Sequence, residues 1–256
     1  LGFDLSSTGH TSTKGSKYWL LIVDYATKMK WSQYLRDKST LPEVMMRFLS
    51  HLQSTGHVVK KLRCDNSGEN RKLQEFVEKE GLGINFEYTA PYTPQQNGLV
   101  ERCFPTLYAR ARAVMIEAGM PEALQQKLWA EATNAVTLLD NITSKSGEKC
   151  AHEQFYGVEP PYVKYLKTFG EMAVIANRAA NGKLIPKGFT AIFVGYAADH
   201  APDVFRFYKL STRTIIMSRD VQWLDKSYGD WALTTKSPYS DFVPPVPIRN
   251  SFDDED

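Results

Sequence analysis

The sequence has few cysteines, and they form neither a metal-binding nor a disulfide pattern. Cys64, Cys103 and Cys150 lie far apart and include no Cys-x-x-Cys pair. An odd number of widely spaced cysteines is typical of free thiols in a reducing compartment, so we expect neither a disulfide nor a zinc site within the chain. The five histidines are also scattered without the spacing of metal ligands.

Long hydrophobic runs are missing as well. A membrane-spanning helix needs about 18–20 apolar residues, whereas the longest run, around Trp19–Val23, has the length of a strand. The chain starts at Leu1 without a charged and apolar leader, so we expect no secretory signal and interpret the sequence as a fragment. Its 256 residues, 43% of them hydrophobic, are enough for one large domain or two modest ones.

Neither sign of charge is in large excess, because the formal net charge is only +2. Ser240–Asp256 contains five acids and one arginine, which leaves a net charge of about +6 on residues 1–239. A mildly basic body suits a polyanionic partner such as nucleic acid. Proteins with many other functions carry a similar charge, so this feature alone decides nothing.

Strand and helix signals alternate over residues 1–140, which we expect to form one α/β domain. Tyr18–Tyr25 is a near-continuous apolar run, as in a strand buried on both faces, and Lys30–Leu35 reads as its neighbour. Pro121 opens the last helix of this region, which runs to about Leu139. The pattern predicts a mixed sheet with helices on its faces. The other expected elements are a strand carrying Asp4, helix Leu41–Leu52, strand Val58–Cys64, helix Arg71–Lys79 with Leu73, Phe76 and Val77 inward, strand Ile84–Tyr88, and a helix with Val100, Phe104, Leu107, Ala111 and Val114 on one face.

The second half of the chain shows a different pattern. Periodicity fades over residues 141–167, which we interpret as a linker, and short β runs over residues 168–230 predict a small all-β barrel-like domain. Residues 231–256 are Pro-rich and then acidic, so we expect this tail to be disordered. The β runs are Met172–Ala176, Thr190–Tyr196, Val204–Leu210, Thr214–Ser218 and Val221–Leu224.

Three carboxylates fall where a metal site would need them. Asp4 lies on the first expected strand, Asp65 at the carboxyl end of a later strand, and Glu101 at the start of a helix. Phosphoryl transfer assisted by two metal ions needs hard oxygen ligands, which Mg²⁺ prefers. Taken singly, an aspartate after a strand is usually a turn residue and a helical glutamate is usually solvated. The hypothesis therefore depends on the combination of the three acids and on their neighbours.

Those neighbours resemble a known family, the integrases of copia-type retrotransposons, within the retroviral integrase superfamily. The most specific pieces surround Asp65 and Glu101, which are separated by 35 residues, and the resemblance covers almost the whole chain. The segments that carry it are Leu62–Glu69 (LRCDNSGE), Tyr92–Arg102 (YTPQQNGLVER), Trp129–Ala132 (WAEA), Ile192–Tyr196 (IFVGY) and Ser218–Val221 (SRDV).

The resemblance implies a fold, a mechanism and partners. The fold would be an RNase H-like mixed five-stranded sheet flanked by helices, followed by the small barrel-like domain. Asp4 and Asp65 would share one Mg²⁺ or Mn²⁺ ion, and Glu101 with either aspartate would hold a second. One ion would activate water for 3′-end processing or a DNA 3′-hydroxyl for strand transfer, while the other stabilises the leaving oxygen. Double-stranded DNA (element cDNA ends and target DNA) and a homo-oligomer are implied, with no membrane. Integration would take place in the nucleus, after a cytoplasmic virus-like particle stage.

Residues near the two central motifs are candidates for contacts with nucleic acid. Tyr92 would stack on a base or sugar, and the polar side chains beside it would bond to a phosphate. An ordinary polar surface loop is the alternative. The candidates are Asn66, Tyr92, Gln95, Gln96, Asn97, Gly98 and Arg102.

The chain departs from the family pattern at several positions. Pro105 follows Glu101 by four residues, so it lacks the N–H that would bond the Glu101 carbonyl in a helix, at a cost of about 3 kcal/mol. Either the helix starts later than usual or it kinks beside the metal ligand. Asn70 replaces a usual aromatic residue, and Glu171 replaces a usual cysteine. We interpret these changes as sequence drift and expect the fold to survive while strand transfer is weak or lost.

Two other functions are compatible with this sequence. The first is a non-catalytic nucleic-acid-binding or assembly module that remains after catalytic decay. The second is a related nuclease that cuts without joining, although such a nuclease has no need of the downstream β domain.

Overall fold

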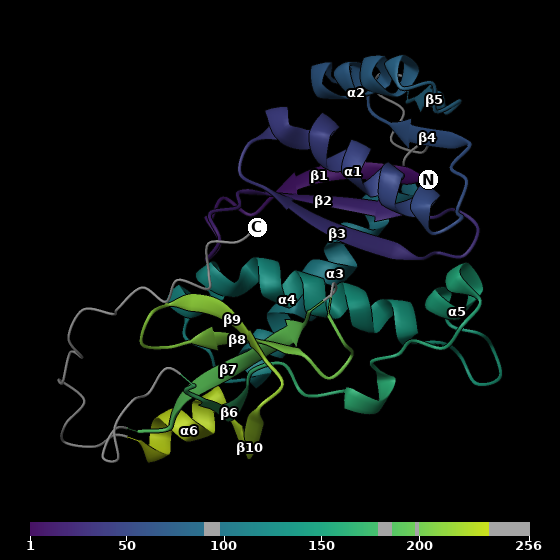
Figure 1. Ribbon diagram of the computed structural model, residues 1–256. Coiled ribbons are helices and arrows are strands. Elements are labelled where there is room, and N and C mark those ends of the chain that lie inside the picture. Colours follow the sequence, from purple (N-terminus) through teal and green to yellow (C-terminus); the bar gives the residue numbers. More distant parts are fainter. Residues whose placement is uncertain (90–97, 179–185, 198–199, 236–256) are drawn as a thin grey trace.

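A mixed five-stranded sheet forms the first part of the molecule. The computed structural model describes residues 1–89, 98–178, 186–197 and 200–235 (Figure 1). The strand order is β3-β2-β1-β4-β5, with β1, β2 and β3 antiparallel and β4 and β5 parallel to β1. The sheet expected for residues 1–140 is thereby confirmed. Its strands are β1 (Gly2–Ser7), β2 (Tyr18–Val23), β3 (Lys30–Leu35), β4 (Lys61–Cys64) and β5 (Asn85–Tyr88).

Helices cover both faces of this sheet. The expected burial of β2 on both faces is confirmed, because Leu20 and Ile22 pack in one apolar cluster and Trp19 and Leu21 in another. α1 (Leu41–Ser54), preceded by a short 3-10 helix (Lys38–Thr40), and α2 (Gly68–Lys79) contribute to the first cluster. α3 (Gly98–Glu117) and α4 (Glu122–Ile142) contribute to the second. One detail of the sequence interpretation is wrong: Phe76 on α2 is 42% exposed and does not face the core.

The segment interpreted as a linker contains a short helix, α5 (Ala151–Tyr156), and a 3-10 turn, Val163–Tyr165. A capping box starts α5, since Glu153 accepts a bond from the Cys150 N–H while the Cys150 sulfur accepts one from the Glu153 N–H. Phe155 stacks on His57 with a centroid distance of 4.4 Å. α5 therefore packs against the first domain. With six residues, the helix is too short to produce a periodic apolar pattern in the sequence.

A second sheet, entirely antiparallel, follows. Its strand order is β10-β6-β7-β8-β9, and its interior is built from aromatic side chains such as Phe193, Phe207 and Trp223. In the described part of the chain no ladder joins β9 to β10, so the sheet is not closed by hydrogen bonds. A short helix, α6 (Tyr228–Thr234), includes residues 231–234 of the tail that was expected to be disordered. The strands are β6 (Glu171–Ala176), β7 (Gly188–Tyr196), β8 (Phe205–Lys209), β9 (Thr214–Ser218) and β10 (Val221–Ser227).

α4 lies between the two sheets (Figure 1). On one side, Thr133 bonds the Tyr34 hydroxyl of β3 at 2.8 Å. On the other side, both carboxylate oxygens of Glu131 accept bonds from Nη2 of Arg206 on β8, at 2.7 and 2.6 Å. Leu128 and Trp129 share one apolar cluster with β7 residues and with β2 residues. The two sheets are therefore joined through one buried helix.

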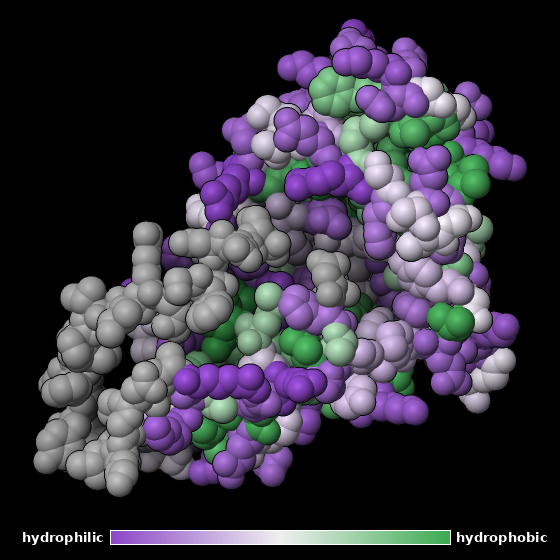
Figure 2. All heavy atoms as spheres, viewed as in Figure 1, coloured by the Kyte–Doolittle hydropathy of each residue, from purple (hydrophilic) through white to green (hydrophobic). Residues whose placement is uncertain are grey.

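On the face seen in Figure 2, hydrophobic side chains gather in separate small patches between hydrophilic ones. No helix in the described ranges is long and apolar enough to span a membrane.

The ion pair between Glu131 and Arg206 gives a test of how the sheets are joined. Removing the acid in Glu131→Ala leaves the Arg206 charge in a site where only 20% of its side chain is exposed. We expect a loss of about 3 kcal/mol in the free energy of unfolding, at the low end of the range for breaking a buried pair. Urea denaturation measures this loss. The exposed pair of Arg178 and Asp220 is the control, and Asp220→Ala should cost less than about 1 kcal/mol. Equal losses in the two variants would contradict the structural role of Glu131.

Candidate functional site

Parallel pairing of β1 and β4 places Asp4 beside Asp65. Gly2 pairs with Arg63 across the two strands. Continuing this register by two residues brings Asp4 level with Asp65, which directly follows β4. Neighbouring strands lie about 4.8 Å apart, so the two aspartates occupy adjacent positions at one edge of the sheet.

The same face of β1 meets α3, which carries Glu101. A side chain at Gly2 would point at Val100 on α3, because a Cβ built there lies 3.0 Å from its Cγ2 atom. Side chains two residues apart on a strand share a face, so Asp4 and Ser6 point to this side as well. Ser6 accepts a hydrogen bond from the Tyr108 hydroxyl of α3 at 3.0 Å. The fold therefore directs all three predicted acids to one region.

The electrostatics of Asp4 reflects this convergence. Burial, together with the negative charges of Asp65 and Glu101, raises the pKa of Asp4 to about 6. The N–H of Leu5 donates to Oδ1 of Asp4 at 2.8 Å and, together with the charge of Lys38, opposes the increase in pKa. Lys38 was not singled out from the sequence, since nothing in its neighbours marks a lysine 34 positions after Asp4 as close to it.

Asp65 is held by the start of α2. Its Oδ1 atom accepts a hydrogen bond from the Ser67 N–H at 3.3 Å and one from Nδ2 of Asn70 at 2.5 Å. Asn70 also donates to the Asp65 carbonyl oxygen at 3.1 Å. Sequence reasoning noted Asn70 only as a departure from a family pattern. The signal in the sequence is that Asn70 follows Asp65 by five residues. A residue in the first turn of a helix lies close to the segment that precedes the helix, so the Asn70 side chain can reach Asp65.

The donor chemistry of the three acids fits a divalent cation, because carboxylate oxygens are the ligands that Mg²⁺ prefers. Their arrangement is more open than a complete ligand set. Within the described ranges, no three His, Cys, Asp or Glu side chains lie close enough together to hold one ion. Glu101 is exposed and lies three residues from the start of α3.

Pro105 lies inside α3, at the eighth position of a helix that begins at Gly98. The alternative in which the helix starts later and places Pro105 in its first turn is therefore wrong. Pro105 is exposed, so its ring fits on the outer face of the helix. Its missing N–H leaves the carbonyl of Glu101 without the usual bond from four residues ahead.

The candidates for contacts with nucleic acid are only partly described. Tyr92, Gln95, Gln96 and Asn97 lie outside the described residues. Gly98 is the first residue of α3, and Arg102 is exposed one position after Glu101. Asn66 is exposed beside Asp65, and its Oδ1 accepts a bond from Nε of Arg71 at 2.9 Å. The described candidates therefore lie around the three acids.

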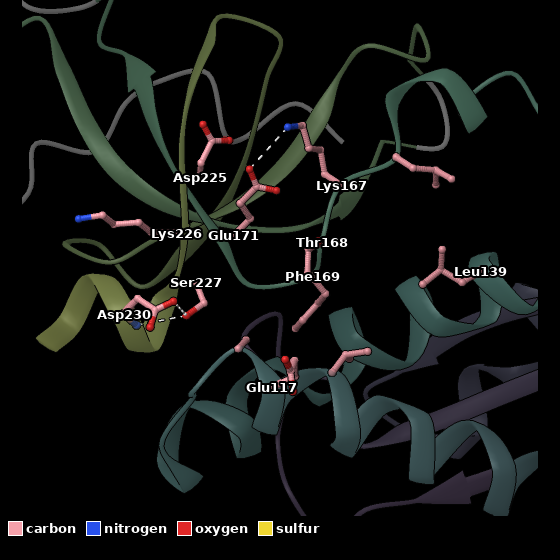
Figure 3. Close-up of a pocket in the computed structure, with 13 residues that line it drawn as sticks. Glu117, Leu139, Lys167, Thr168, Phe169, Glu171, Asp225, Lys226, Ser227 and Asp230 are labelled. Atoms are coloured by element: carbon pink, nitrogen blue, oxygen red, sulfur yellow. Dashed lines mark hydrogen bonds and ion pairs between the residues drawn. The ribbon is translucent and has the colours of Figure 1, made fainter. Parts of the chain in front are cut away.

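A separate cleft of about 930 Å³ lies between the ends of α3 and α4 and the second sheet (Figure 3). None of the three acids lines it. Glu171, the departure from the family cysteine, points toward Lys167, and these side chains form an ion pair of 3.5 Å. Asp230 accepts a bond from the Ser227 hydroxyl at 2.8 Å. Both of these acids in the cleft are thus engaged in local structure.

A family model and several known proteins are similar to this chain. Residues 172–237 match the family model described as the retroviral polymerase SH3-like domain. The retrovirus-related Pol polyprotein from transposon TNT 1-94 of Nicotiana tabacum is 29% identical over 215 residues, 82% of this chain and 16% of the relative. The Pol polyprotein from transposon RE1 of Arabidopsis thaliana is 25% identical over 222 residues, 86% of this chain and 15% of the relative. A crystal structure of the catalytic core domain of BIV integrase has 18% identity and a TM-score of 0.43, covering 64% of this chain and 97% of the other.

These matches show that the chain is similar to a segment of retrovirus-related Pol polyproteins, and that its second sheet matches the SH3-like domain model. The resemblance to copia-type retrotransposon integrases that was found in the sequence is confirmed. The chain spans about a sixth of the length of the curated relatives named above.

The raised pKa of Asp4 predicts a specific pH dependence of stability. The folded state binds this proton more tightly than the unfolded chain, so the contribution of Asp4 is fully present below about pH 4 and is lost as the pH rises to about 6. Asp4→Asn removes the charge and keeps an oxygen for the Leu5 N–H. In a chelating buffer we expect this variant to be more stable than the wild type by roughly 2–3 kcal/mol at about pH 7.5, with the difference vanishing near pH 4.

Urea denaturation at several pH values measures this difference. Asp37→Asn is the control, because hydrogen bonds from Ser39 lower the pKa of the exposed Asp37. This control should show no gain in stability at neutral pH. A pH-independent effect of Asp4→Asn would contradict the electrostatic account.

Proposed function

We propose that this chain carries the catalytic site of a DNA integrase, which processes element cDNA ends and joins them to target DNA by phosphoryl transfer assisted by two Mg²⁺ or Mn²⁺ ions. The observation that carries the proposal is the convergence of Asp4, Asp65 and Glu101. The register of β1 and β4 brings the aspartates level, and the charges of Asp65 and Glu101 both act on the pKa of Asp4. The relationship to retrotransposon Pol polyproteins supports the same function.

Each acid has a role in this proposal. When bound, the cations supply charge neutralisation and polarise the attacking and leaving oxygens. Asp4 and Asp65 would hold one ion, and Glu101 with either aspartate would hold the other. The Leu5 N–H fixes one oxygen of Asp4, and the donors at Ser67 and Asn70 fix one oxygen of Asp65. These contacts orient the carboxylates before an ion arrives, which lowers the entropy cost of binding.

Double-stranded DNA is the proposed substrate, bound in the nucleus by a homo-oligomer of the integrase. Residues 1–239 carry a net charge of about +6, which favours contact with phosphates. Asn66, Gly98 and Arg102 lie around the acids, where a scissile phosphate would sit. Arg110 contributes less to DNA binding than Arg102 in this proposal, because its guanidinium pairs with Asp140. The same carboxylate also pairs with Lys30 at 2.7 Å.

A second candidate function is a non-catalytic module that binds nucleic acid or assembles with other chains after catalytic decay. Two observations favour it: Pro105 lies inside α3 four residues after Glu101, and the three acids do not form a closed ligand set. A phosphoryl-transfer site tolerates little misplacement of its groups.

An assay that joins a DNA end to a target duplex separates these functions. We expect weak joining that depends on Mg²⁺ or Mn²⁺ in the wild type and none in Asp65→Asn, because that variant lacks a charged ligand. Asp220→Asn, an exposed change outside the site, should retain wild-type joining. DNA binding without cleavage or joining by the wild type, in either metal, would support the non-catalytic module instead.

Replacing Pro105 tests whether the helix limits activity. Pro105→Arg restores the N–H for the Glu101 carbonyl and should increase strand transfer while stabilising the fold by up to about 3 kcal/mol. Pro105→Ala restores the same N–H without a new cation. If only the arginine variant gains activity, the added DNA contact is responsible rather than helix geometry. If the original chain is already as active as Pro105→Arg, the interpretation of drift at this position is wrong.

A further inference from the structure

Asn70 is a buried amide that donates to one predicted metal ligand at two atoms. It lies in the first turn of α2 and is only 4% exposed, on the side of the helix that also buries Leu73 and Val77. Its Nδ2 atom donates to the carbonyl oxygen of Asp65 at 3.1 Å and to the carboxylate Oδ1 at 2.5 Å. The side chain thus links the backbone and the carboxylate of the same residue.

The orientation of this amide is fixed by its acceptors. Both atoms that face Nδ2 are oxygens of Asp65, so a flipped amide would set Oδ1 of Asn70 against two acceptors. In the orientation observed, Oδ1 of Asn70 is buried and has no hydrogen-bond partner within the described ranges. Burying an unpaired carbonyl oxygen is costly, and an apolar side chain of the same size would fill this space without that cost. A role in packing alone therefore does not explain an asparagine here.

We infer that Asn70 is a positioning residue for Asp65, which rests on the proposed function of Asp65 as a metal ligand. The bond from Nδ2 involves one of the two carboxylate oxygens and limits rotation of the group about its side-chain torsions. A carboxylate restrained in this way presents its ligand oxygen in one direction, so less conformational entropy is lost when a cation binds. Asn70 itself touches neither substrate nor ion.

This role also changes the interpretation of position 70. The sequence suggested that Asn70, in place of an aromatic residue, marks drift. An aromatic hydrocarbon ring has no donor for Asp65, whereas the amide supplies a short bond to it. The departure thus adds a contact at the candidate site, close to the acid whose flanking residues match the family best.

The test compares Mn²⁺ affinity with stability in the complete chain. Asn70→Leu keeps the approximate size of the side chain and removes both the donor and the unpaired oxygen. Isothermal titration with Mn²⁺ should show binding that is about 10–100-fold weaker than in the wild type. Asn70→Ala is a second variant that should show the same loss if the leucine does not fit. Circular dichroism and thermal unfolding in a chelating buffer establish that each variant is folded.

A matched control removes a buried amide elsewhere. Asn141 is 3% exposed, and its side chain donates to the Lys30 carbonyl at 2.7 Å and accepts from the Lys30 N–H at 2.9 Å. Asn141→Leu should lower the unfolding temperature and leave the Mn²⁺ affinity unchanged. A general loss of stability would weaken Mn²⁺ binding equally in Asn70→Leu and Asn141→Leu. A difference in Mn²⁺ affinity between the two variants therefore measures the positioning of Asp65.

The outcomes distinguish the inference from the function on which it rests. If the wild type binds no Mn²⁺, or if Asp65→Asn binds it equally well, the proposed metal site fails and the role of Asn70 with it. If Asp65→Asn abolishes binding while folded Asn70→Leu and Asn70→Ala bind as tightly as the wild type or more tightly, only the positioning role is overturned.

Discussion

The architecture depends on α4, a helix that must bury two opposite faces at once. One face bonds β3 through Thr133 and Tyr34, and the other meets the second sheet through the pair of Glu131 and Arg206. Residues 128–133 of α4 are all buried, so this part of the helix is enclosed on every side, and the enclosure comes from two different sheets. The α/β domain and the SH3-like domain are therefore not independent bodies connected by a linker. They share one apolar cluster, which includes Trp19 of β2 and Ile192 of β7.

The positions of the two aspartates in the candidate site are set by strand pairing in the first sheet. Parallel pairing of β1 and β4 brings together Asp4 and Asp65, two acids that are 61 positions apart in sequence. Partial burial then makes the charge on Asp4 unfavourable, and the neighbouring carboxylates increase that effect. Such a cluster of acids is costly to the fold, which is a common property of candidate functional sites. Glu101 is the least constrained of the three acids, since it is exposed near the start of α3.

The departures from the family pattern have different physical consequences. Pro105 lies on an exposed face and removes one helical hydrogen bond next to Glu101, so its effect falls on a candidate ligand. Glu171, the first residue of β6, forms an ion pair with Lys167, and the second sheet is intact. Asn70 makes a new bond to Asp65. A sequence comparison treats these three changes alike, whereas their contacts differ: the first removes a helical hydrogen bond, the second forms an ion pair, and the third donates to Asp65.

The sequence by itself determined the order and type of nearly all the elements and the resemblance to a family, and it supplied the three acids as candidates, because apolar periodicity and short motifs are local signals. Strand β9, Thr214–Ser218, was predicted to the residue. The sequence did not reveal the exposure of Phe76, the packing of α5, the position of Pro105 within α3 or the contact of Asn70 with Asp65. Only the tertiary structure decided these features, and it also decided that α4 joins the two sheets. Each of them depends on which distant residues come into contact, and strand register and helix packing set those contacts only when the whole chain folds.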